Sequence, residues 1–143
     1  MLRRNWQDQG LADYPGAGAA GGLGYALLAY LKAELHSGID IMLDLANFDE
    51  AIKDADLVVT GEGKSDEQTL MGKVPHGVLR RCKKLGVPVW LLSGSIEDIS
   101  GILTKSFDFI RSINDGDNRP ISVLLQADVA KENLTKTMKN LII

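Results

Sequence analysis

Residues 56–75, DLVVTGEGKSDEQTLMGKVP, determine the predicted architecture. The apolar run Leu57-Val58-Val59 predicts a strand, which leads into a loop with two glycines, two carboxylates and a lysine in six residues. In open α/β sheets, ligands bind outside the carboxyl ends of the strands, so this polar loop is predicted to form a binding site. An ordinary polar turn between a strand and a helix is the alternative that the local chemistry leaves open.

The loop and the residues after it combine three kinds of chemistry. Glycine lets the backbone approach a ligand closely, carboxylates can hold a cation or accept a proton, and lysines can neutralise phosphate oxygens. The candidates are Gly61, Gly63, Glu62, Asp66, Lys64 and Lys73. Gly63-Lys64-Ser65 matches the end of a Walker A motif, but Val58 stands where the first glycine of that motif would be. Any phosphate must therefore be bound in another way.

The composition narrows the classes of partner and compartment. The chain has 143 residues, enough for a domain that buries about two-thirds of its unfolded surface. A net charge of -3 argues against nucleic acid or an anionic membrane as the main partner. The single Cys82 excludes an internal disulfide, and no apolar run approaches the roughly twenty residues of a membrane span. Because residues 1–14 also lack the apolar core of a signal peptide, a cytoplasmic protein is expected.

A second glycine-rich stretch, PGAGAAGGLG, occupies residues 15–24. Gly16, Gly18 and Gly21 have the spacing of a dinucleotide-binding fingerprint, but no strand precedes them, so that interpretation is rejected. Two alternatives stay open. The stretch can bind an anion at a helix N-terminus, with Gly18, Gly21 and Gly22 as candidate contacts, or its small residues can allow close helix packing.

The remaining elements are predicted from hydrophobic periodicity and from turn residues. In chain order we expect an arm over residues 1–15, a helix from Leu23 that Gly38 ends, a strand at 39–43, and a short helix carrying Phe48 and Ile52 that Asn47 or Asp49 caps. Next come a helix over 75–85 with an inward face of Val74, Val78, Leu79, Cys82 and Leu85, a central strand at 87–93 with Trp90 in the core, an edge strand at 107–113, and a helix over 121–143 that is continuous or broken near 132–133.

Two further features follow from this arrangement. The basic residues Arg80, Arg81, Lys83 and Lys84 are predicted to form a solvated face that complements the dipole of their helix. Ser93 and Gly94, at the end of the central strand, are predicted to form a second loop on the ligand side. The alternation of strands and helices predicts an α/β fold with a three-layer parallel sheet.

The sequence resembles the class I glycerate kinase family. The resemblance rests on PGAGAAGGLG at 15–24, on DADLVVTGEGKSDEQTLMGKVPHGV at 54–78 and on LLSG at 91–94. It implies an enzyme that uses ATP and Mg2+ to phosphorylate D-glycerate, commonly to 2-phosphoglycerate. It also implies two α/β domains, with residues 1–50 as the tail of an inserted second domain and 51–143 as the C-terminal half of a Rossmann-like domain.

The chemistry of phosphoryl transfer suggests roles for the candidate residues. Lys64 and Lys73 are expected to bind phosphate, and either Glu62 or Asp66 to hold Mg2+. The other carboxylate is expected to accept the proton of the glycerate hydroxyl, and Asp66 is the preferred base. Gln68 and Thr69 are expected to contact the substrate. Lys64 and Ser65 depart from the family, which more often has arginine and an aliphatic residue there.

The resemblance covers only the C-terminal part of family members, which are more than twice as long. We therefore expect that the 143-residue chain alone is inactive and that its unpaired sheet edge favours a homo-oligomer. A catalytically incomplete, non-enzymatic binding module is the main alternative. A receiver-like signalling domain shares the layering, but it needs its acidic residues on separate strands, and here both lie in one loop.

Overall fold

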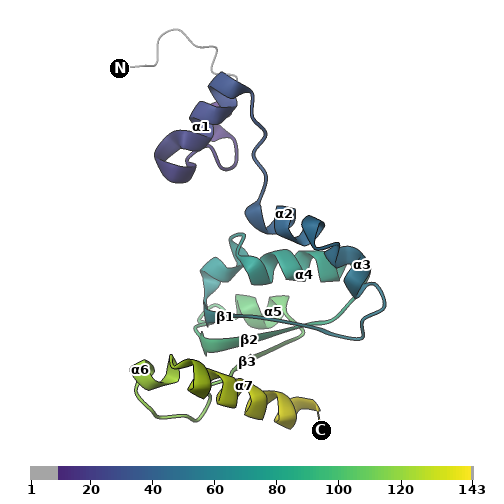
Figure 1. Cartoon of the computed structure of the whole chain (residues 1–143), viewed down its shortest axis with the longest axis vertical. Helices are drawn as coiled ribbons and strands as arrows, with labels where there is room; N and C mark the ends of the chain where they lie inside the picture. The colour runs from purple at the N-terminus through teal and green to yellow at the C-terminus, as the bar shows by residue number, and fades with distance from the viewer. Residues whose placement is uncertain (1–9, 143) are drawn as a thin grey trace. The chain divides into compact units, whose positions relative to one another are not determined.

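The computed structural model describes residues 10–142, which fall into two compact units, Met1–Ser37 and Gly38–Ile143. Figure 1 shows the order of the elements along the chain. The boundary between the units lies within the segment 1–50 that the resemblance assigns to an inserted domain. That assignment stays a prediction.

The first unit holds a 3₁₀ turn, η1 (Leu11–Asp13), and one helix, α1 (Ala19–Leu31). The start of α1 is irregular, because Ala20, Gly21 and Gly22 take left-handed φ angles of 51°, 68° and 98°. A Cβ on Gly24 would lie 2.3 Å from the carbonyl oxygen of Gly16, so glycine at position 24 lets the loop fold back on the helix. The small residues thus serve close packing within the glycine-rich stretch itself.

The predicted end of this helix at Gly38 is wrong. Helix α1 ends at Leu31, and Lys32 follows in a left-handed conformation with φ 50°. Gly38 instead begins helix α2 (Gly38–Leu45), so the predicted strand at 39–43 is also wrong. Ile39 and Leu43 are four residues apart, lie on one side of α2 and pack with the core, whereas Ile41 and Met42 are exposed. The apolar residues at 39, 41 and 43 alternate in the way that is typical of a strand, which explains the wrong prediction.

The second unit is built on a parallel sheet of three strands, in the order β1 (Val58–Ser65), β2 (Val89–Ile96) and β3 (Phe109–Ser112). The predicted central place of the second strand and edge place of the third are confirmed. Figure 1 shows α4 (Val74–Leu85) and α5 (Ile102–Ser106) on one side of the sheet and α7 (Ala127–Ile142) on the other. This is the predicted α/β arrangement in three layers.

Short elements complete the unit. Helix α3 (Phe48–Ile52) is present as predicted, although the side chain of Asn47 makes no capping hydrogen bond. The 3₁₀ turn η2 (Glu67–Leu70) joins β1 to α4. The C-terminal helix is broken at 125–126, between α6 (Ile121–Leu124) and α7, and α7 is continuous through 132–133, where the break was predicted.

The main core lies between the sheet and α4, where Val89, Leu91 and Leu103 have no exposed surface. Helix α4 contributes Val78, Leu79 and Cys82 to it, as predicted, but Val74 and Leu85 are exposed. Trp90 is half-buried rather than in this core, and its ring centroid lies 5.0 Å from that of Phe109 on the neighbouring strand.

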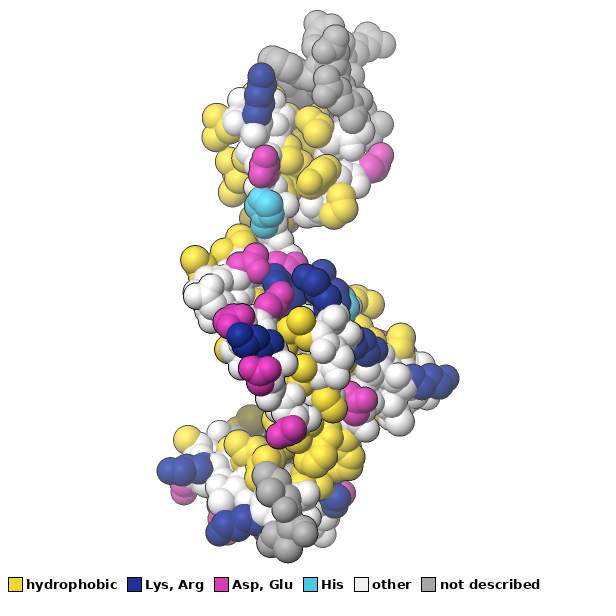
Figure 2. Space-filling model, turned by 90° about the vertical axis from the view of Figure 1, so that its right-hand side faces the viewer, with side chains coloured by type: hydrophobic (Ala, Val, Ile, Leu, Met, Phe, Trp, Pro, Cys, Tyr) yellow, Lys and Arg dark blue, Asp and Glu magenta, His cyan; other side chains and the backbone are white. Residues whose placement is uncertain are grey.

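The basic end of α4 is only partly the solvated face that was predicted. The side chain of Arg81 is 19% exposed and donates hydrogen bonds to Asp44 and Asp49, while Arg80 donates to Asp40. The hydrogen bonds to Asp44 and then Asp49 raise the pKa of Arg81. These contacts tie α4 to α2 and α3, so part of the cluster holds the helical layer together. On the face drawn in Figure 2, acidic and basic side chains are interspersed.

No helix within residues 10–142 combines the length and the apolar character that crossing a bilayer requires.

Candidate functional site

The candidate site begins in β1, which is longer than predicted. Residues expected in a loop continue the strand to Ser65, with Glu62 opposite Ser93 and Lys64 opposite Ser95. The second loop predicted at Ser93 and Gly94 is likewise wrong, because both residues lie inside β2, which continues to Ile96. Gly61 makes this pairing close, because a Cβ there would lie 2.1 Å from the carbonyl oxygen of Leu92. The polar side chains are therefore fixed by a sheet ladder instead of a mobile turn.

Glu62 is held by two buried hydroxyls. Its Oε1 accepts hydrogen bonds from Ser65 Oγ at 3.0 Å and from Thr69 Oγ1 at 2.5 Å. The Oγ of Ser65 also lies 2.5 Å from the Oγ of Ser93, and all three hydroxyl residues are at most 1% exposed. One oxygen of the Glu62 carboxylate is thus fixed from the protein side, which orients the whole group.

Asp66 lies between two lysines and begins η2. Its Oδ1 accepts a hydrogen bond from the N–H of Gln68 at 3.0 Å. Its own N–H donates to Thr69 Oγ1 at 3.1 Å, which is one arm of the capping box between Asp66 and Thr69. The Nζ of Lys73 lies 3.6 Å from Asp66 Oδ1, and the Nζ of Lys64 lies 4.0 Å from Oδ2. The predicted acidic and basic candidates are therefore brought together at this carboxylate.

Lys64 has a second partner that the sequence did not predict. Its Nζ lies 2.7 Å from an oxygen of Glu97, directly after β2, and the hydrogen bond to Glu97 raises the pKa of Lys64. Lys73 is the N-cap residue of α4 and follows Gly72, whose φ is 94°. Its ammonium group therefore lies beside the positive end of a helix, where anions are favoured.

Two hollows are both lined by Gly61 and Glu62 of β1. The first, of about 580 Å³, is lined by parts of α2, β1 and the start of α4, and includes Gly61, Glu62 and Lys73. The second, of about 310 Å³, includes Gly61 and Glu62 again, together with Ser93 and Gly94 from β2. Glu62 thus borders space on both sides, which is where a ligand at the carboxyl ends of the strands would lie.

The donor atoms present can complete a Mg2+ site only with help from a ligand. No group of three or more acidic, histidine or cysteine side chains suited to a metal lies within the part of the chain that the structure describes. Mg2+ is, however, often held by one or two carboxylates together with substrate phosphates and water. Glu62 and Asp66 fit that pattern.

The remaining predicted contacts have different surroundings. Gln68 is exposed on η2, so its amide can reach a ligand. Thr69 is buried, and its hydroxyl is used by Glu62 and by the Asp66 N–H, so a supporting role suits it better than substrate contact. Gly18, Gly21 and Gly22 lie in the first unit; Gly21 and Gly22 have open space where a Cβ would be.

Ser65 is a functional candidate that the sequence reasoning missed. In the sequence it stands out only at the end of an incomplete Walker A match and as a departure from a family pattern, yet it links Glu62 to Ser93. The available signal was the spacing of Ser65 three positions after Glu62. The sequence predicted a loop at these residues, and a loop gives no reason to expect a hydrogen bond between them.

Comparison with known proteins identifies relatives over nearly the whole chain. The family model described as the glycerate kinase family matches residues 2–143. A Bacillus cereus protein named glycerate kinase is 45% identical over 132 residues, which are 92% of this chain and 34% of the relative. An Escherichia coli protein named glycerate 2-kinase is 52% identical over 91 residues, 64% of this chain and 24% of the relative.

A solved structure agrees with these sequence relatives. A Salmonella typhimurium LT2 protein whose crystal structure carries the name glycerate kinase 2 superposes with a TM-score of 0.54 at 34% identity. The superposition covers 87% of this chain and 33% of that protein. The chain thus spans about a third or less of the length of these three relatives.

Proposed function

The chain belongs to the glycerate kinase family, and we propose from that premise that it supplies one side of the active site of an ATP-dependent glycerate kinase. The observation that carries this proposal is the grouping of Lys64, Asp66 and Lys73 beside the fixed Glu62. Phosphoryl transfer requires mainly positioning and charges placed on the transferring oxygens, and this group offers both.

In the proposed reaction, a hydroxyl oxygen of D-glycerate attacks the γ-phosphorus of ATP. The new O–P bond forms as the bond to the β–γ bridging oxygen breaks, and ADP leaves. Asp66 accepts the hydroxyl proton, while the ammonium groups of Lys64 and Lys73 lie over the phosphate oxygens. The presence of an Escherichia coli relative named glycerate 2-kinase favours the C2 hydroxyl and therefore 2-phosphoglycerate.

Since Asp66 is proposed as the base, Glu62 is the carboxylate proposed to hold Mg2+. Mg2+ bound there would offset the negative charge of the phosphate groups. The hydroxyls of Ser65 and Thr69 fix one oxygen of Glu62, so the carboxylate would meet the metal in a set orientation. Gln68, Gly61 and Gly63 are proposed to contact the substrate or the phosphates.

The domain assignment and the compartment complete the proposal. Residues 1–50 would be the tail of an inserted domain, which includes Gly18, Gly21 and Gly22, and residues 51–143 would be the C-terminal half of a Rossmann-like domain. We propose the cytoplasm as the compartment, on the expectations from composition and from Cys82, which is free and buried.

A second candidate function rests on the share of the relatives that is matched. Because the chain covers 34% of the Bacillus cereus relative, a catalytically incomplete binding module is the alternative. Such a module would bind a nucleotide or glycerate without turnover.

A chimera separates the two functions. Residues 1–143 would replace the matching third of the Bacillus cereus relative, and ATP and D-glycerate would be supplied. Turnover, with a new phosphate ester detected by 31P NMR, supports the kinase. If the chimera folds but makes no ester, while the Bacillus cereus parent is active in the same assay, the kinase proposal is wrong and the binding module is supported.

A further inference from the structure

Gly94, near the end of β2, is fixed from both neighbouring strands. On the β1 side, a Cβ at Gly94 would lie 2.6 Å from the carbonyl oxygen of Gly63, so the two backbones are close. On the β3 side, the carbonyl oxygen of Gly94 accepts two hydrogen bonds, from Ser112 Oγ and from Asn114 Nδ2, each at 2.9 Å. The backbone at Gly94 therefore has little freedom to move toward either strand.

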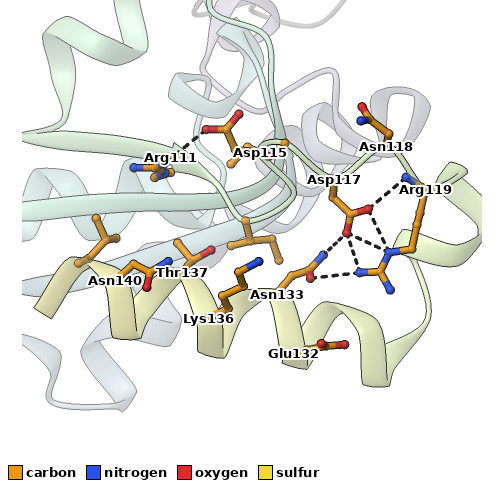
Figure 3. A pocket seen from close by; sticks show the side chains of 14 residues that line it. Arg111, Asp115, Asp117, Asn118, Arg119, Glu132, Asn133, Lys136, Thr137 and Asn140 are labelled. Carbon is orange, nitrogen blue, oxygen red and sulfur yellow. Dashed lines mark hydrogen bonds and ion pairs between the residues drawn. The ribbon is translucent and has the colours of Figure 1, made fainter. Parts of the chain in front are cut away.

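Asn114 is itself held by α7. Its Oδ1 accepts a hydrogen bond at 2.8 Å from Nδ2 of Asn133, a residue of α7 that is only 8% exposed. The same nitrogen donates to Asp117 Oδ2 at 3.0 Å, and Asn133 Oδ1 accepts from Arg119. Figure 3 shows Asn133 pointing from α7 toward the paired Asp117 and Arg119. A buried amide thus links a helix near the C-terminus to the end of the central strand.

The network lies at one end of a polar hollow of about 320 Å³ between the loop 111–119 and α7. The pairing with Arg119 holds the pKa of Asp117 well below its usual range, so this anchor is charged at neutral pH. The amide atoms that link Asp117 to Gly94 each have a partner. A buried polar network in which every group has a partner holds its residues in one arrangement. Loss of one hydrogen bond should let the backbone at Gly94 move.

We propose that Asn114 and Asn133 are positioning residues that hold the backbone of β2 at Gly94, which lines the same hollow as Glu62, in the shape that binds the phosphates of ATP. The structural half of this inference, that the two amides fix Gly94, stands on these hydrogen bonds. The functional half, that the fixed backbone at Gly94 serves ATP, rests on the proposed function. Asn114 and Asn133 touch no reacting atom in this scheme and act through the backbone of Gly94.

Hydrogen exchange of the 143-residue chain tests the structural half without any activity. Asn114→Asp keeps the size of the side chain and its acceptor, but it removes the N–H that reaches Gly94. Peptides covering 92–97 should exchange about tenfold faster in this variant, while peptides covering 76–84 of α4 stay unchanged. Asn118→Ala, a truncation of an exposed amide in the same loop, is the control and should change neither region. Equal exchange at 92–97 in Asn114→Asp and the parent overturns the inference.

Kinetics of the chimera with the Bacillus cereus relative test the functional half. Asn114→Asp and Asn133→Ala should raise KM for ATP about tenfold and leave KM for D-glycerate and kcat within about twofold. A merely structural role would lower kcat through a loss of folded protein and would leave both KM values unchanged, and that result overturns the functional half. An inactive parent chimera counts against the proposed kinase, and faster exchange at 92–97 would in that case still support the fixing of Gly94.

Discussion

The hydroxyl of Thr69 donates a hydrogen bond to Oε1 of Glu62 and at the same time accepts one from the N–H of Asp66. A single buried side chain thus joins the carboxylate of Glu62 to the backbone of Asp66. The two acidic residues are four positions apart in sequence, and the turn of η2 brings Thr69 back beneath them. The hydroxyl of Thr69 therefore contributes to the relative placement of these two residues.

Removal of that hydroxyl should therefore destabilise the fold. Thr69→Val keeps the shape of the side chain but removes its hydroxyl. The N–H of Asp66 then has no acceptor, and Oε1 of Glu62 loses one of its two donors. We expect the free energy of unfolding to fall by about 1–3 kcal/mol, the usual cost of such buried groups. Urea unfolding of the 143-residue chain measures it. Thr69→Ser retains the hydroxyl and should lose less, and equal stability of Thr69→Val and the parent would show that the contact is dispensable.

Two glycines of β1 should respond differently to a methyl group. A Cβ at Gly61 would lie 2.1 Å from the backbone of Leu92, whereas nothing lies within 4 Å of a Cβ at Gly63. Gly61→Ala should cost about 1–3 kcal/mol as overpacking, and Gly63→Ala, the matched control, should cost under about 1 kcal/mol. Thermal or urea unfolding distinguishes the two. Similar losses in both variants would contradict the close pairing of β1 and β2 at Gly61.

The pair formed by Asp117 and Arg119 predicts a dependence of stability on pH. The pKa of Asp117 is lowered in the folded state from its ordinary value of 3.8. A lowered pKa contributes stability that is present above the unfolded value and is lost as the pH falls toward the folded one. The Tm difference between the parent and Asp117→Asn should therefore be largest above about pH 5 and shrink below about pH 4. A constant difference from pH 7 to pH 2 would exclude the linkage.

Lys73 should act on ATP and not on folding. Its side chain is 40% exposed at the start of α4, where its ammonium group adds to the positive helix end. In the chimera, Lys73→Met should raise KM for ATP or lower kcat by about tenfold or more, with little change in Tm. Lys83→Met, at an exposed position in the last turns of the same helix, is the control. A large fall in Tm with normal kinetics would make Lys73 a structural residue.

The isolated chain should be inactive and should self-associate. In the proposed function, the carboxyl-terminal parts of β1 and β2 supply only one side of the active site, and correct positioning accounts for roughly 7–11 kcal/mol of such a reaction. β1 is an edge strand of eight residues, and Val59 on it is 42% exposed. Light scattering should show a dimer or larger species, and a coupled assay no turnover of D-glycerate. A monomeric and active chain would contradict both expectations.

The sheet and its ligand-side edge could be predicted from the sequence because their signals are local. The continuous apolar run at 87–93 marks a strand buried on both faces, and Pro75 and Gly86 bound α4. The strand predicted at 39–43 failed because helical and strand patterns coincide in a short apolar segment. The tertiary structure shows a helix there, in which Ile39 packs closely against Gly77: a Cβ at Gly77 would lie 2.4 Å from the side chain of Ile39.

The site was predicted less completely than the sheet. Its carboxylates and lysines stand out in the sequence, but the hydroxyl contacts of Ser65 and the amide link from Asn133 to Asn114 depend on tertiary placement. The two asparagines are 19 positions apart, and no spacing rule connects them. Likewise, the ion pairs from Arg81 to Asp44 and Asp49 could not be foreseen, since the helix that carries Asp44 was predicted as a strand.

The central claim is that the carboxylate of Asp66 takes part in phosphoryl transfer to glycerate. The most direct measurement is the kcat of the chimera with Asp66→Asn, beside Asp54→Asn as a control at an exposed position before β1. We expect kcat to fall about a hundredfold or more in Asp66→Asn, with an unchanged Tm, and to stay normal in the control. Turnover by Asp66→Asn within about twofold of the parent would contradict the proposed role of Asp66.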